Sequence, residues 1–140
     1  MRLLLAAILA LISTNLIAQD LPKEKSAEGA TVYIISPADG ATVSSPVTVV
    51  FGLKGMGVAP AGSMVGNTGH HHLLVDADLP NLDQPVPADE NHLHFGGGQT
   101  QHDLVLPPGE HTLQLVLGDR IHLPHDPPVF SEKITITVVE

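Results

Sequence analysis

Apolar and polar residues alternate along most of the chain, and this period of two constrains the fold more than any other feature. Val47, Val49, Phe51 and Leu53, for example, fall on one face of an extended segment. We find no long segment with the 3.6-residue period of an amphipathic helix. The sequence therefore predicts an all-β fold.

Clusters of glycine, proline, asparagine and aspartate separate the alternating segments, and such residues favour turns. Residues 55–62 are so rich in glycine and proline that we expect a loop there. We expect strands at residues 31–35, from about 46, and at 70–77, 92–95, 102–106, 111–117 and 133–139. About seven short strands separated by turns are typical of a single immunoglobulin-like antiparallel β-sandwich.

The N-terminus has the features of a cleaved signal peptide. Met1 and Arg2 form a short positive start, residues 3–12 an apolar run, and residues 16–18 a cleavage site. The run is shorter than the roughly 20 residues that span a bilayer, and no stop-transfer pattern follows. We therefore expect a signal peptide at residues 1–18, a flexible leader at 19–30, and one exported domain at 31–140 with no membrane attachment after cleavage.

The charge and cysteine content narrow the possible partners. The formal net charge is -9, and removal of Arg2 makes the mature chain more negative still. This negative net charge argues against electrostatic binding to nucleic acid or anionic lipid, whereas it is compatible with the binding of metal ions. The chain has no cysteine, so nitrogen, oxygen or thioether sulfur would have to hold a metal. Met56 and Met64 could supply thioethers, although packing is their more ordinary role.

Histidines are the most informative residues for function. All nine lie between positions 70 and 125, and most are one to three residues from another histidine. Two histidines that are separated by one residue on a strand point to the same face, roughly 6.5 to 7 Å apart along it, so that their rings can converge on one ion. Imidazole is the commonest metal ligand in proteins. The repeated His-x-His pattern, with a His-x-x-His in a loop, therefore predicts a metal site.

Alternation sorts the histidines into structural residues and candidate ligands. His71 shares a face with Leu73 and Val75, and His102 and His111 are in phase with leucines of their own segments. We expect these three histidines to be structural. The candidate ligands lie on the opposite face or in loops, and each could instead be a solvated surface residue: His70, His72, His92, His94, His122 and His125.

Five motifs occur in order along the chain: Ser36-Pro37-x-Asp39-Gly40, GMGVAPAG at 55–62, GHHHLLVD at 69–76, HLHFGGGQT at 92–100, and HLPH at 122–125 followed by Pro127-Pro128. Together they resemble a bacterial periplasmic family known as a domain of unknown function. The resemblance covers roughly residues 31–139. It implies a periplasmic location and a sandwich fold, and it implies no activity.

Three classes of function fit these observations. The first is a periplasmic metal-binding protein that captures or delivers an ion at an exposed site, with copper favoured and zinc next because Cu²⁺ exceeds Zn²⁺ in the divalent affinity order. The second is a copper-dependent redox enzyme, by architectural analogy with copper-zinc superoxide dismutase. The third is an envelope module that binds a periplasmic protein partner without metal. We favour the first. Enzymatic activity stays open but is not favoured, because no hydrolase or metalloprotease motif is present.

Overall fold

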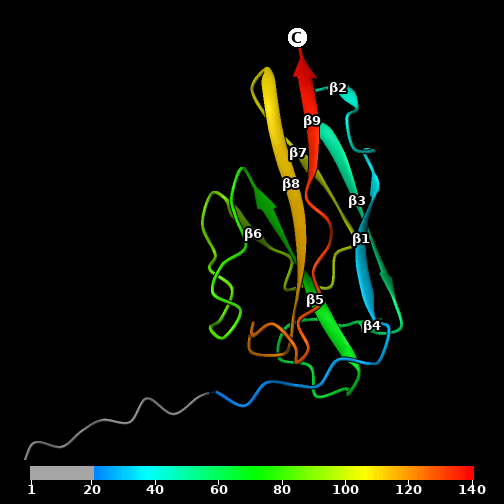
Figure 1. Ribbon diagram of the computed structural model, residues 1–140, viewed down its shortest axis with the longest axis vertical. Coiled ribbons are helices and arrows are strands. Elements are labelled where there is room, and N and C mark those ends of the chain that lie inside the picture. The colour runs from blue at the N-terminus through cyan, green and yellow to red at the C-terminus, as the bar shows by residue number, and fades with distance from the viewer. Residues whose placement is uncertain (1–20) are drawn as a thin grey trace, which may run out of the picture.

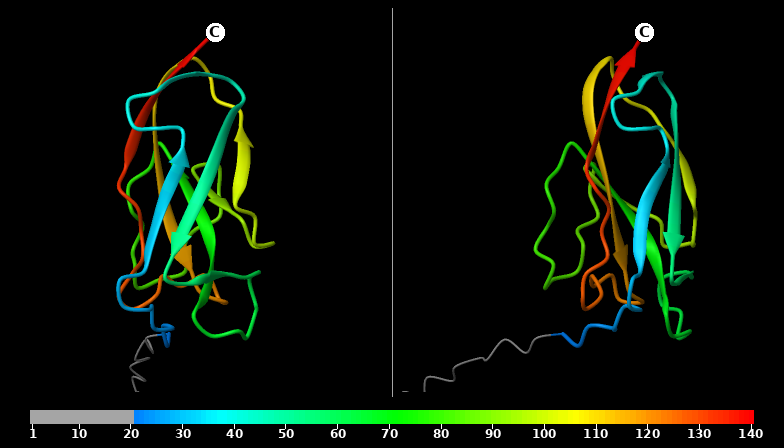
Figure 2. Two further views of the ribbon diagram at one scale, coloured as in Figure 1. Left: turned by 90° about the vertical axis from the view of Figure 1, so that its right-hand side faces the viewer. Right: turned by 45° about the vertical axis from the view of Figure 1, so that its right-hand side comes forward.

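The computed structural model describes residues 21–140, and the expected signal peptide lies outside this range. Residues 21–140 form nine β-strands and no helix. The strands make two sheets that pack face to face, as Figures 1 and 2 show. None of the described residues belongs to a helix that could cross a membrane.

One sheet has three antiparallel strands and the other has six. The smaller sheet has the order β1-β3-β7, formed by Thr31–Ser36, Val47–Lys54 and Gln101–Leu104. The larger has the order β2-β9-β8-β5-β4, formed by Thr42–Ser44, Ile134–Val139, Gly109–Gly118, Thr68–Val75 and Gly57–Val58. A ninth strand, β6 (His92–His94), also pairs with β5.

The predicted all-β sandwich is confirmed, and each of the seven expected strands is present. The two additional strands, β2 and β4, are three and two residues long, and each pairs with its neighbour in parallel. The prediction of a loop throughout residues 55–62 is wrong at β4. Alternation cannot reveal such a strand, because two paired residues contain only one period of the pattern.

The main core lies between the two sheets. Val49 from β3, Leu73 from β5, Leu115 from β8 and Ile136 from β9 are completely buried within one apolar cluster. Their inward orientation explains the alternation in the sequence, because successive side chains of a strand point to opposite faces. This packing fixes which face of β5 turns toward the core and which turns away.

The outer face of the larger sheet is covered as well. The segment that joins β5 to β6 (residues 76–91) passes along this face, on the side away from β3 in Figure 2. Its Val86 packs with Leu74 and Val116 in a second apolar cluster. Because β5 is covered on both sides, every residue from 69 to 75 is buried.

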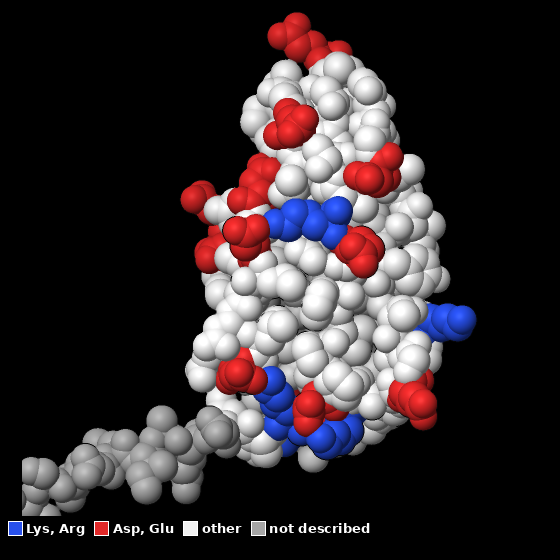
Figure 3. Space-filling view, viewed as in Figure 1, with Lys and Arg blue, Asp and Glu red and all other residues white. Residues whose placement is uncertain are grey.

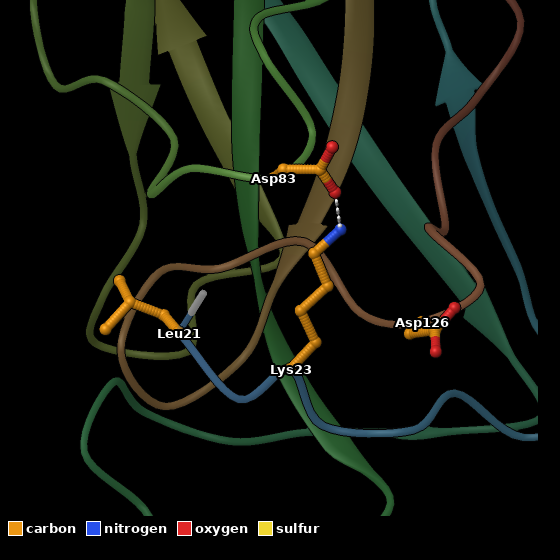
Figure 4. A pocket seen from close by; sticks show the side chains of 4 residues that line it. All are labelled: Leu21, Lys23, Asp83 and Asp126. Atoms are coloured by element: carbon orange, nitrogen blue, oxygen red, sulfur yellow. Dashed lines mark hydrogen bonds and ion pairs between the residues drawn. The ribbon is translucent and has the colours of Figure 1, made fainter. Parts of the chain in front are cut away.

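The chain entering β1 is attached to loops at one end of the sandwich. Asp126 exchanges backbone hydrogen bonds with it, accepting from the Ser26 N–H at 3.2 Å and donating to the Glu24 carbonyl at 2.9 Å. Lys23 Nζ donates to Asp83 Oδ1 at 2.5 Å, in the hollow that Figure 4 shows. These contacts attach residues 23–26 to the domain, and the flexible leader expected at residues 19–30 stays a prediction.

Charged side chains are sparse on the surface. On the face shown in Figure 3, the basic side chains at the middle and at the lower end lie beside acidic ones, and one at the right-hand edge stands apart. Lys133 pairs in this way with Asp78 at 2.6 Å, and Arg120 pairs with Glu24 at 3.0 Å. Such pairing breaks up any positive patch on that face.

Candidate metal centre

Strands β5 and β6 bring three histidines together on the outer face of the larger sheet. The antiparallel register places His72 opposite His94, and His70 lies two residues before His72 on the same face. The ring centroids are 4.8 Å apart for His70 and His72, 5.0 Å for His70 and His94, and 5.1 Å for His72 and His94. The three rings therefore form one group.

A fourth histidine comes from the loop after β8. His122 has a φ of 70°, in the left-handed region that non-glycine residues seldom adopt. Its ring centroid lies 4.7 Å from that of His94 and 5.1 Å from that of His70. This unusual backbone conformation directs the His122 ring toward the other three rings.

Asp119 holds the turn that carries His122. The side chain is fully buried, and its Oδ1 accepts hydrogen bonds from the Ile121 N–H at 2.9 Å and the Leu123 N–H at 3.0 Å. The His122 carbonyl in turn accepts from the Val86 N–H at 2.9 Å. These bonds tie the loop both to its own backbone and to the segment that covers the sheet.

The ring nitrogens of the four histidines converge. One nitrogen from each of His70, His72, His94 and His122 lies within 4.8 Å of the others. His70 Nε2 is 3.0 Å from His72 Nε2 and 3.1 Å from His122 Nδ1. A neutral ring nitrogen carries either one proton or one lone pair, so His70 Nε2 cannot make a full hydrogen bond to each. Nitrogens around a tetrahedral ion lie roughly 3.3–3.4 Å apart, given metal–nitrogen distances of about 2.0–2.1 Å. The short contacts approach that spacing.

Burial keeps the inner rings uncharged. Desolvation, together with a smaller effect of the neighbouring histidines, lowers the pKa of His70 to about 4 and that of His72 to about 2. The pKa of His94 is also lowered, first by desolvation and then by His122. Neutral imidazole is the form that binds a metal. The inner part of the cluster is therefore in its binding form at neutral pH.

The cluster has a buried side and an open side. His70 and His72 are each 1% exposed, whereas His122 is half-buried and His94 is exposed. The Nδ1 atoms of His70 and His72 are buried without a hydrogen-bond partner among the described residues. An unpaired buried polar atom costs about 1–3 kcal/mol. His71 Nε2 and His125 Nδ1 outside the cluster are unpaired in the same way, so the convergence of ring nitrogens is what distinguishes the four clustered histidines.

The comparison with protein families supplies one match. Residues 49–139 match the family described as a domain of unknown function, DUF4399. The chain belongs to the DUF4399 family. No curated protein and no solved structure matches it. The segment of this DUF4399 chain that matches the family contains all four clustered histidines and every strand from β4 to β9.

Two of the six candidate ligands lie outside the cluster. His92 occupies the same face of β6 as His94, but the register places it beside Leu74, and its Nδ1 is 2.8 Å from Asp89 Oδ1. His125 is fully buried, and its Nε2 is 3.1 Å from the Thr68 carbonyl. The two histidines of the His-x-x-His motif therefore point to different places, because the backbone turns at His122.

The expectation of an exposed site is wrong for the inner half of the cluster. His70 and His72 are buried, although the sequence interpretation placed the candidate ligands on an exposed face or in loops. The rings of His94 from β6 and His122 from the loop after β8 lie against them, on a face that antiparallel sheets commonly leave to solvent. The loop residue His125 is buried for a different reason, because its ring packs against β5 beside Gly69.

The remaining histidines make contacts outside the cluster. His71 is buried with its ring centroid 5.2 Å from that of Phe51, in the main core. His111 lies between Asp76 Oδ2 at 2.7 Å and the Pro107 carbonyl at 2.9 Å. These contacts agree with the structural roles predicted for both. His102 is exposed at the edge of the sandwich and lies against Phe95.

Sequence reasoning missed three residues that shape the DUF4399 site. Asp119 directly follows Gly118 at the end of β8, and a Gly-Asp pair after an apolar strand is a turn signal that could have identified it. Gly96 and Gly118 themselves lie against the rings of His94 and His72. Nothing in the one-dimensional pattern links Gly118 to His72 on another strand, whereas Gly96 lies only two residues after His94. Met56 packs against the main core as expected, whereas Met64 is 81% exposed and does not pack in this way.

Proposed function

We propose that this DUF4399 chain is a periplasmic metal-binding protein that captures or delivers copper, with zinc the next candidate. The ligands are His70, His72, His94 and His122. The observation that carries the proposal is the convergence of four ring nitrogens, from two strands and one loop, within 4.8 Å of one another. Separate structural histidines would each find a hydrogen-bond partner, whereas these face one another.

The chemistry of the ligand set favours copper. Imidazole nitrogen suits copper, zinc and nickel, and Cu²⁺ binds most strongly in the divalent series. Four neutral ligands leave the double positive charge of the ion uncompensated within the cluster. The net charge of -9 on the whole chain offsets this charge at longer range.

The open side of the cluster supports capture or delivery rather than a purely structural ion. A competing ligand can approach the ion only where the site meets solvent, which is at His94 and His122. His70 and His72 hold the ion from the buried side. The periplasmic location rests on the signal-peptide features of residues 1–18 and fits a protein that exchanges metal outside the cytoplasm.

Chelator competition on untagged protein, residues 19–140, tests the proposal. We expect one Cu²⁺ per chain with a dissociation constant well below micromolar, and weaker binding of Zn²⁺. His72→Ala and His94→Ala should each weaken Cu²⁺ binding strongly. His92→Ala is the matched control, because His92 lies on the same face of the same strand as His94 but beside Leu74. Equal loss in His92→Ala and His94→Ala, or weak binding without fixed stoichiometry, would refute the assignment and favour a protein-binding module.

A further inference from the structure

The ring of His94 occupies the space where a side chain of residue 96 would lie. A Cβ atom built on Gly96 would overlap Cε1 of His94 and lie 2.6 Å from its Nε2. Carbon and nitrogen atoms without a bond between them do not approach this closely, since favourable contacts begin near 3.5 Å. The imidazole can therefore hold its position only because residue 96 is glycine.

The same relation occurs on the buried side of the cluster. A Cβ atom on Gly118 would lie 2.8 Å from Nε2 of His72, the nitrogen that is 3.0 Å from His70 Nε2. Gly118 ends β8 and pairs with His70 across the β5–β8 ladder. Glycine inside a strand often marks a close approach by another group, and here the approaching group is a candidate ligand.

Backbone conformation does not account for either glycine. Gly98, two residues after Gly96, has a φ of 81° and needs the freedom that glycine provides. Gly96 and Gly118 are absent from the residues of positive φ. An alanine backbone could adopt the conformation at both positions, so the space taken by the imidazole is what requires glycine.

We propose that Gly96 is a positioning residue of the metal site, which lets the His94 ring turn across the backbone of residue 96 toward His72 and His122. The inference rests on the proposed function, because it assigns a role in metal binding to a residue that supplies no ligand atom. In the protein without metal as well, the size of residue 96 should decide where the His94 ring lies.

Gly96→Ala tests the proposal, and Gly97→Ala is the matched control. The atoms nearest to a Cβ on Gly97 would be those of the side-chain amide of exposed Gln99, at 3.1 Å, and this amide can move aside. We expect Gly96→Ala to weaken Cu²⁺ binding roughly ten- to hundredfold, as loss of a residue that orients a ligand typically does. Its electron paramagnetic resonance spectrum should report fewer coupled nitrogens. Gly97→Ala should retain the wild-type affinity and spectrum, and an equal loss in both variants would overturn the proposal.

A double-mutant cycle shows whether Gly96 acts through His94. Once His94→Ala has removed the ring, Gly96→Ala should have no further effect on Cu²⁺ affinity, since the clash no longer exists. Losses of equal size in the wild-type and His94→Ala backgrounds would show that residue 96 acts on the fold instead. That result would overturn the positioning role.

Nuclear magnetic resonance of the metal-free protein separates this inference from the proposed function. The imidazole signals of His94 should shift in Gly96→Ala, while those of His92 on the same strand stay in place. Unchanged His94 signals would overturn the inference whether or not the protein binds metal. Shifted signals in a protein whose wild type binds no Cu²⁺ would support the placement of the ring and refute the metal-binding function.

Discussion

His70 Nε2 and His72 Nε2 lie 3.0 Å apart on the covered face of β5. Both rings are buried, and the opposite nitrogen of each has no partner among the described residues. Two neutral imidazoles in this arrangement can share at most one hydrogen bond. A cation placed between them would engage both Nε2 atoms at once, which supports metal binding over simple packing.

Metal should stabilise the folded protein, because an ion that binds only the folded state shifts the unfolding equilibrium. At a free Cu²⁺ concentration roughly 100 times the dissociation constant, the free energy of unfolding should rise by about 2.7 kcal/mol. Denaturant unfolding with and without the ion measures this, and a chelator should reverse it. His102→Ala, in the other sheet, should respond like the wild type. A His72→Ala protein that gains as much stability as the wild type would contradict the site.

Gly118→Ala should crowd His72. The added methyl group would lie 2.8 Å from His72 Nε2 in a buried region, and overpacking of this kind costs about 1–3 kcal/mol. We expect lower stability without metal and weaker Cu²⁺ binding. Adding His72→Ala to Gly118→Ala should recover stability, because the small side chain makes room for the methyl group. If the double variant is less stable than both single variants, the two residues do not compete for the same space.

Asp119→Ala should release the turn that carries His122. The substitution removes the acceptor of the Ile121 and Leu123 N–H groups, and a buried donor without a partner costs about 1–3 kcal/mol. Thermal unfolding and Cu²⁺ affinity should both decline. Asp119→Asn is the informative comparison, since its amide oxygen can replace Oδ1 as the acceptor. Asn and Ala variants with the same Cu²⁺ affinity would show that the turn does not position His122.

The pair formed by His111 and Asp76 should contribute stability that depends on pH. The hydrogen bond between His111 and Asp76 is the main reason that the pKa of His111 is raised above the usual 6.5. The folded state therefore holds the proton more tightly than the unfolded state does. This contribution is fully present below about pH 6.5 and is lost as the pH rises through the raised pKa.

Replacement by His111→Gln tests this pair. The difference in unfolding free energy between wild type and variant should be larger at low pH and should shrink as the solution becomes alkaline. Denaturant titrations at pH values on both sides of 6.5 measure it. A difference that grows with rising pH would contradict the assignment of a protonated His111 bound to Asp76.

Alternation was sufficient to predict most strands and the structural role of His71, because these follow from which residues face the core. It could not separate His92 from His94, since both occupy the same face of β6. Only the register of β6 against β5 places His94 beside His72 and His92 beside Leu74. His72 and His94 are 22 residues apart in the sequence, and tertiary packing decides how their two strands pair.

The other half of the site depends on a turn and a covering segment. His122 and His125 have equal standing in the sequence, but the positive φ of His122 directs only that ring into the cluster. The covering segment packs Val86, Ala77 and Leu79 with Leu74 and Val116 on the outer face of the larger sheet. Prolines and acidic residues separate these apolar residues in the sequence, so they give no periodic signal.

X-ray absorption spectroscopy of the Cu²⁺-loaded protein tests the central claim most directly. The account predicts one ion per chain with imidazole scattering from four histidines at about 2.0 Å, falling to three in His94→Ala and unchanged in His92→Ala. A bound ion with two or fewer imidazoles, or a wild-type spectrum that His94→Ala leaves unaltered, would contradict the four-histidine site.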